Sequence, residues 1–267
     1  PSKRNWALLG IAIGLLSLAA PPFLLAIPLL AWWALKWGGG GKRGAALTLA
    51  TGLAVLAPAT LHNFAACGEF IPVSAQAGVT FHHGNGPGAV GVYHPIAGVS
   101  ASRLHQNPDA FRLAAEGGGA SGWKSSSQWF LRQGLDWMWE NPGQACALWV
   151  KKATWTLTGL VYGDVYLPAL EREDGLPGSG ALRISLVLFL PIALMGLVWQ
   201  ALRKGRAAFP QAILLLIPLA VCVVFFYSPR YRLPAAIPTV ILLGGALGAG
   251  ISRMPGRMFL PALALGA

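Results

Sequence analysis

The chain has 267 residues, of which 55% are hydrophobic and only 11% are charged, and its formal net charge is +11. Soluble domains carry about 25% charged residues, so this composition argues against an ordinary soluble enzyme. The basic residues flank apolar runs in twos and threes and form no basic face with stacking aromatics, which excludes nucleic acid as a partner and favours lipid headgroups and phosphates.

The charges are divided between two kinds of segment. All nine acidic residues and all five histidines lie between His62 and Arg183, the only long polar stretch. Up to Ala181 this stretch also holds seven basic residues, so its net charge is −2, and the other 13 basic residues lie in flanks without any acid. A membrane protein shows this pattern when one large loop lies on one side and basic anchors lie on the other.

The N-terminal apolar run, Trp6–Leu35, is interrupted by a double proline at Pro21 and Pro22. A double proline disrupts a helix, and the uninterrupted run would exceed the roughly 20 residues that a bilayer needs. The pattern therefore predicts a helical hairpin, Trp6–Ala20 and Pro22–Leu35.

A flexible basic turn, Lys36–Arg43, leads to a third apolar run, Ala45–Leu61. Three more apolar runs follow the polar stretch: Ile184–Leu202, Ala207–Tyr227 and Leu233–Ile251. The sequence predicts an all-α integral membrane protein with about six transmembrane helices and one large loop of mixed structure. Residues 1–61 and 184–267 supply three helices each, and residues 62–183 form the loop domain.

Six crossings would put ten basic residues of short connections and termini on one face. They are Lys3, Arg4, Lys36, Lys42, Arg43, Arg203, Lys204, Arg206, Arg253 and Arg257. The positive-inside rule makes that face cytoplasmic. We therefore expect a multi-pass protein of the inner (plasma) membrane whose loop is extracytoplasmic.

Within the loop, Phe64–Gly98 is rich in glycine, proline and aromatic residues and predicts short strands and turns, with a strong turn signal at 85–88. Ser127–Leu157 predicts a tryptophan-rich helix that is interrupted at Asn141-Pro142. Such helices favour the headgroup level, where Lys151 and Lys152 would reach lipid phosphate.

The strongest candidate site is Arg230-Tyr231-Arg232, between the prolines at 229 and 234. The planar guanidinium suits a phosphate oxyanion, although arginine and tyrosine also serve as plain interfacial anchors. Both interpretations stay open.

Other candidates are weaker. The segments around Glu69 and Asn85 could shape a substrate pocket, or they could be a structural pair of turns. His82, His83 and His94 lack metal-ligand spacing, so no cofactor is expected and a divalent metal is a minor alternative. Two loop cysteines, Cys67 and Cys146, could pair in an oxidising compartment, but free thiols are favoured. Two acidic features have no convincing catalytic spacing: Asp164 is isolated, and the cluster Glu171, Glu173 and Asp174 is typical of a solvated loop.

Three stretches together resemble the C-terminal half of the polytopic GT-C glycosyltransferases, in the bacterial protein O-mannosyltransferase-like group (family 39). They are Thr60–Ala89, Trp137–Lys152 and Arg230–Pro234. Two positions depart from the family pattern: His62 stands where arginine is usual, and Gly86 where a second asparagine is frequent.

The resemblance implies a membrane enzyme that transfers a sugar from a polyprenyl-phosphate donor to a glycan, lipid or protein acceptor on the outer face. It implies a donor phosphate site at Arg230, Tyr231 and Arg232 with Lys151 and Lys152. It also implies a substrate pocket that contains His62, Asn63, Glu69 and Asn85. The family's acidic base lies in an earlier loop, so we expect it upstream of Pro1 and expect this chain to be inactive alone.

Two other classes remain open. An O-antigen ligase or polysaccharide polymerase also has a large outer loop, and such enzymes use loop histidines and arginines without an upstream base. A non-catalytic membrane protein is the other open alternative. A transporter or channel component is disfavoured because the apolar runs hold almost no ionisable residue at mid-membrane.

Overall fold

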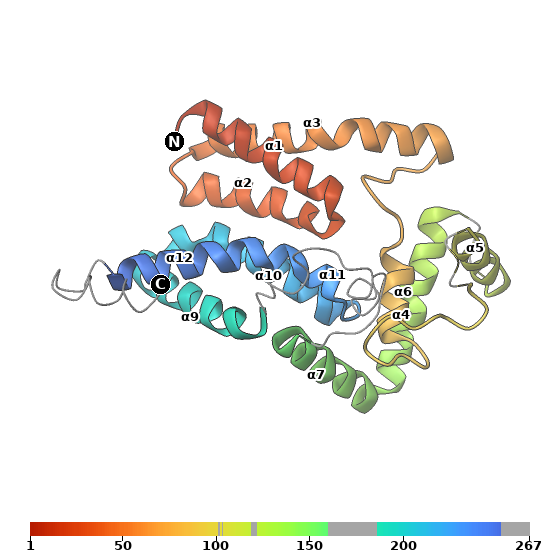
Figure 1. Cartoon of the computed structure of the whole chain (residues 1–267). Helices are drawn as coiled ribbons and strands as arrows, with labels where there is room; N and C mark the ends of the chain where they lie inside the picture. Colours follow the sequence, from red (N-terminus) through yellow and green to blue (C-terminus); the bar gives the residue numbers. More distant parts are fainter. Residues whose placement is uncertain (101, 103, 119–121, 160–185, 252–267) are drawn as a thin grey trace, which may run out of the picture.

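The computed structural model describes residues 1–100, 102, 104–118, 122–159 and 186–251 (Figure 1). These residues are largely helical, and they contain no strand, only an isolated bridge between Val92 and Tyr227. The all-α prediction is confirmed. The expected strands of the loop are wrong.

Three helices form the N-terminal group: α1 (Lys3–Ala19), α2 (Ala26–Lys36) and α3 (Gly41–Cys67). As predicted, the first apolar run breaks at the double proline, where the short 3-10 helix η1 (Pro21–Leu25) reverses the chain. Proline lacks a backbone N–H and fixes φ, so the helix cannot continue through it. Figure 1 shows α1 and α2 beside α3, whose C-terminal end projects beyond them.

Small and hydroxylated residues bring α1 and α3 together. The hydroxyl of Thr51 donates to the carbonyl of Ala7 at 3.0 Å, and that of Thr48 to the carbonyl of Trp6 at 3.3 Å. A Cβ on Gly10 would overlap the Thr51 hydroxyl and the Thr48 carbonyl. Small residues permit close backbone approach in this way in membrane helix pairs.

The C-terminal group packs beside the first. Its elements are α9 (Leu186–Lys204), η2 (Gly205–Ala208), α10 (Phe209–Val224), α11 (Pro229–Arg232), η3 (Leu233–Ala235) and α12 (Ala236–Ile251). Leu190, Leu215 and Leu242 lie in its buried core. Ile213 of α10 packs with Ile27 of α2, so the two groups share an apolar contact.

Rings and cations gather at one end of the helical groups, where α2 ends and η2 turns the chain. Trp32 and Trp37 stack edge-on with centroids 4.4 Å apart, and the Arg206 guanidinium lies 5.0 Å from the Trp37 ring. The indole of Trp33 donates to the Arg206 carbonyl at 2.9 Å. In Figure 1 the N-terminus lies at this end, and α4–α7 lie at the opposite end.

The loop domain consists of α4 (Ala77–Asn85), α5 (Gln106–Glu116), α6 (Trp123–Glu140) and α7 (Pro142–Thr158). The helix break at Asn141-Pro142 is confirmed. Where strands were expected, α4 forms because it packs tightly on α6: the Gly78 N–H donates to the Ser127 hydroxyl at 2.9 Å, and a Cβ on Gly134 would lie 2.9 Å from the Phe81 ring.

The third helix extends beyond the apolar run that predicted it. The third helix does not end at Leu61 but continues to Cys67, where Gly68 adopts a φ of 71° and donates to the Phe64 carbonyl at 2.8 Å. His62 is therefore a helical residue. The predicted loop end near Arg183, Asp164, the acidic cluster at 171–174 and the basic residues Arg253 and Arg257 lie outside the described residues.

The described helices do not support the predicted count of six membrane crossings, because most of them are too short. Among the described residues, two helical stretches are long and apolar enough to cross a membrane, Gly41–Cys67 and Leu190–Val224, and the second contains the η2 turn. Elsewhere prolines and turns shorten the helices: α2 has 11 residues, about 16 Å of helix, against a hydrocarbon core of about 30 Å. These two stretches support a membrane protein.

The close approach of α1 and α3 should make Gly10 intolerant of a side chain. We expect Gly10→Val to destabilise the protein by about 2 kcal/mol, because the helices must separate to admit it. Reversible unfolding by SDS in detergent micelles measures this.

The control is Gly143→Ala in α7, where an added Cβ meets nothing within 4 Å. It should stay within about 0.5 kcal/mol of the wild type. Equal stability of both variants would contradict the close α1–α3 packing.

Candidate functional site

A buried lysine connects α4, α7 and the end of α10; we refer to this contact as the Lys152 junction. Lys152 is fully buried, and its Nζ donates to Asn85 Oδ1 at 2.8 Å, to the Phe225 carbonyl at 2.9 Å and to the Gly84 carbonyl at 3.3 Å. Three oxygen acceptors match the three donors of an ammonium group.

Asn85 completes the junction. Its Nδ2 donates to the carbonyls of Val224 at 2.8 Å and Phe81 at 3.0 Å, and its Oδ1 also accepts from the Trp149 indole at 3.0 Å. A Cβ on Gly84 would overlap the Phe225 carbonyl, so glycine permits the close approach of α4 to α10. Both the nitrogen and the oxygen of the amide form hydrogen bonds inside the protein, so Asn85 stabilises the packing of α4 against α7 and α10.

Burial lowers the pKa of Lys152 from 10.5 to about 7. Removing an ammonium group from water disfavours its charged form. The junction therefore changes its proton content near neutral pH.

The two arginines of the Arg230–Arg232 bend have different surroundings. Arg232 is buried, its Nη1 donates to the Thr156 carbonyl at 3.1 Å, and its Nε has no hydrogen-bond partner among the described residues. Arg230 is exposed, and its guanidinium lies 5.1 Å from the Tyr231 ring. Arg232 thus anchors the bend to α7, whereas Arg230 faces outward.

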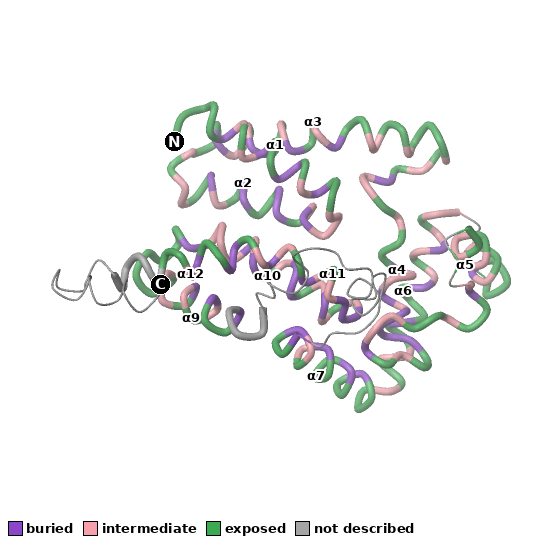
Figure 2. Tube along the Cα trace, viewed as in Figure 1, coloured by how far each residue is buried: buried purple, intermediate pink, exposed green. Residues whose placement is uncertain are grey.

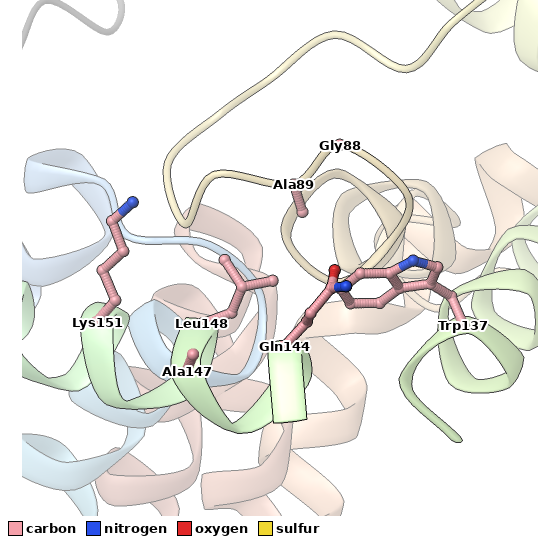
Figure 3. Close-up of a pocket in the computed structure, with 7 residues that line it drawn as sticks. All are labelled: Gly88, Ala89, Trp137, Gln144, Ala147, Leu148 and Lys151. Atoms are coloured by element: carbon pink, nitrogen blue, oxygen red, sulfur yellow. The ribbon is translucent and has the colours of Figure 1, made fainter. Parts of the chain in front are cut away.

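Lys151 borders a pocket of about 340 Å³, the α7 pocket (Figure 3). The pocket is also lined by Gly88, Ala89, Trp137, Gln144, Ala147 and Leu148. The Lys151 Nζ lies 4.7 Å from the Trp155 ring. Figure 3 shows Lys151 at one side and Trp137 at the other. Of the predicted phosphate-binding residues, Lys151 is the one that lines this pocket.

A second pocket of about 480 Å³, the α6 pocket, is also lined by Trp137. One wall is a stripe of α6: Trp129, Phe130, Gln133, Asp136, Trp137 and Glu140. The facing wall includes His82, Pro87, Ile96 and Leu113. Trp137 lines both pockets, so a cationic and a carboxylate-bearing pocket share one aromatic wall.

The four residues expected to form a substrate pocket line neither of these pockets. Glu69 accepts from the backbone N–H groups of Trp123 at 3.0 Å and Lys124 at 2.6 Å, so it caps the N-terminus of α6. Asn63 Nδ2 donates to the Ile71 carbonyl at 3.0 Å, and His62 is exposed on α3. Asn85 belongs to the Lys152 junction.

The loop histidines do not form a common metal site. His83 Nδ1 lies 2.7 Å from the carbonyl of His94. Burial and the neighbouring His83 lower the pKa of His82 to about 4, so its ring is neutral at pH 7. No three metal-binding side chains cluster within the described parts of the chain, and Cys67, Cys146 and Cys222 are free thiols.

The sequence prediction did not include Asp136 or Glu140 as site residues. Their signal was the spacing of Trp129, Gln133, Asp136 and Glu140, which recurs every three or four residues and puts them on one helix face. The facing wall comes from α4, α5 and the segment between them, which local spacing cannot reveal.

Comparison with known proteins finds no matching family model, no matching curated protein and no matching solved structure.

The Lys152 junction predicts a specific pH dependence. Between pH 7 and about 10.5 the unfolded chain keeps the lysine proton that the folded protein has released, so stability should rise with pH in this window. We expect the thermal midpoint of the wild type, relative to Lys152→Met, to increase from pH 7 to pH 10 and to stay constant below pH 6. Thermal unfolding in detergent micelles measures it.

Lys124→Met, at an exposed lysine of α6, is the matched control and should show no such window. A midpoint difference between wild type and Lys152→Met that falls as the pH rises would overturn this account.

Proposed function

We propose that this chain is part of a multi-pass membrane glycosyltransferase that handles a polyprenyl-phosphate-linked sugar at the surface of its loop domain. The observation that carries the proposal is that Trp137 lines both a pocket with a lysine and a pocket with two carboxylates. A glycosyl phosphate carries a sugar ring beside an anion, and the paired pockets offer separate surroundings for these two parts.

The outer surface of the helical groups supports a membrane location. Large apolar side chains point outward on several helices, among them Leu15, Leu53, Met195, Leu202 and Ile237, which are 52–81% exposed. Figure 2 shows such exposed stretches along α1, α3 and α12. An apolar exterior over this many helices is unfavourable in water and suits lipid.

The connection between α6 and α7 supports a lipid donor. Trp139 at the end of α6 is 88% exposed, and Val150, next to Lys151 on α7, is 62% exposed. A tryptophan and a lysine beside exposed apolar residues are typical of the headgroup level, where a prenyl carrier presents its phosphate. Lys151 then contributes a charge-assisted contact to the phosphate oxygens.

The second candidate function, an O-antigen ligase or polymerase, has support from the histidine that lines the α6 pocket. The carrier distinguishes the two: the proposed transferase uses a monophosphate-linked sugar, and the alternative uses a diphosphate-linked glycan.

Phosphate binding tests the proposal. We expect Lys151→Ala to weaken binding of a polyprenyl monophosphate in detergent micelles about tenfold, because one charged hydrogen bond is worth about 1.5 kcal/mol. Lys124→Ala is the matched control, since Lys124 is also exposed but lines neither pocket. Tighter binding of a polyprenyl diphosphate would favour the ligase, and equal binding by wild type and Lys151→Ala would remove the α7 pocket as the donor site.

Membrane orientation is tested with the exposed thiol of Cys146 on α7. An impermeant maleimide added to intact cells should label Cys146 in the wild type. With Cys67 and Cys146 replaced by serine, Lys42→Cys should be labelled only after the cells are permeabilised. Labelling of position 42 but not Cys146 from outside would show that the loop domain lies in the cytoplasm.

A further inference from the structure

We infer that the α6 pocket is a saccharide subsite for a sugar ring that carries no anionic group. The inference rests on the proposed function and extends it, because it assigns a ligand to the carboxylate-bearing pocket that Trp137 lines. Its volume of about 480 Å³ lies within the range of small-molecule sites, roughly 300–1,000 Å³.

Aromatic and apolar groups supply the stacking surface. Trp129 is held rigidly, since its indole donates to the Gly117 carbonyl at 3.1 Å and its ring packs edge-on against Phe130 at 4.8 Å. Trp137 also lines the pocket, together with the apolar side chains of Ile96 and Leu113. The C–H face of a pyranose packs on surfaces of this kind, which exclude water at low cost in side-chain entropy.

The carboxylates and the amide of the pocket lie on one wall. Gln133, Asp136 and Glu140 are exposed on α6 and reach the pocket at successive turns. Within the described residues the ion pairs belong to Arg112, so neither Asp136 nor Glu140 is neutralised by a salt bridge. Carboxylates accept hydrogen bonds from sugar hydroxyls, and an amide both donates and accepts.

The charge of the lining selects among sugars. Among the described residues no lysine or arginine lines the α6 pocket, and the cation Lys151 lines the α7 pocket. Burial keeps the neighbouring His82 uncharged at neutral pH by lowering its pKa to about 4. A uronic acid would place its carboxylate beside Asp136 and Glu140, and the like charges would repel. An amino sugar gains an ammonium–carboxylate contact instead.

Three sugars with one ring framework test this assignment: glucose, glucosamine and glucuronic acid. Binding to the purified chain in detergent micelles is measured by ligand-observed NMR at pH 7. We expect glucosamine to bind most tightly and glucuronic acid at least tenfold more weakly than glucose. Trp137→Ala should reduce glucose binding at least fivefold, and Glu140→Gln should reduce the preference for glucosamine over glucose at least threefold.

Two controls separate the subsite from folding and from the donor site. Trp139→Ala removes a tryptophan that is 88% exposed and lines neither pocket, so it should leave sugar binding unchanged. Lys151→Ala should also leave sugar binding unchanged while it weakens polyprenyl phosphate binding. If the purified chain binds the sugars but does not bind polyprenyl phosphate, the result contradicts the proposed donor site and supports the saccharide subsite.

Three results would overturn the inference. They are binding of none of the three sugars, tightest binding of glucuronic acid, and unchanged glucose binding by Trp137→Ala when its circular dichroism matches the wild type.

Discussion

The ammonium group of Lys152 joins three parts of the chain that are far apart in sequence. It bonds to the end of α4 through Gly84 and Asn85 and to the end of α10 through Phe225. A buried polar group is costly unless its bonds are made, so the three backbone segments must meet in one arrangement. That arrangement fixes α7, and with it Lys151, relative to α4, which carries His82 of the α6 pocket. The geometry of the proposed site therefore depends on a contact outside either pocket.

The N-terminus of α6 is fixed by a carboxylate contact. Glu69 follows the glycine that ends α3 and accepts from the first backbone N–H groups of α6. An acidic side chain at a helix N-terminus satisfies donors that have no partner in the helix and interacts favourably with its dipole. The long apolar helix α3 and the helix that carries the carboxylate stripe are thus joined directly. The Lys152 junction and the Glu69 cap together determine where α6 lies.

Local rules predicted much of the helical architecture from the sequence. The break at Pro21-Pro22 and the break at Asn141-Pro142 follow from proline's missing donor, and both are present. The same local view failed for Phe64–Gly98, where glycine and aromatic residues suggested strands. Gly78 and Gly84 are instead sites where another backbone or side chain comes within contact distance of α4. Packing against α6 determines the secondary structure of this segment, and a single sequence carries no direct record of such long-range contacts.

The site was predictable in part. The sequence singled out Asn85 as a pocket residue and Lys152 and Arg232 as phosphate-site residues. It could not show that the side chain of each donates hydrogen bonds to backbone carbonyls inside the protein. Conversely, Asp136 and Glu140 resemble a solvated helix face, and only the wall from α4 and α5 converts that face into a pocket. Whether a polar side chain faces a partner or a ligand depends on contacts distant in sequence.

Trp137 has one further consequence, because the same indole lines both pockets. A ligand that moves this ring changes the lining of both pockets. Such a ligand then alters the affinity of the other pocket, and thermodynamic linkage makes the effect equal in both directions. Through this shared side chain, ligand binding in one pocket is coupled to ligand binding in the other.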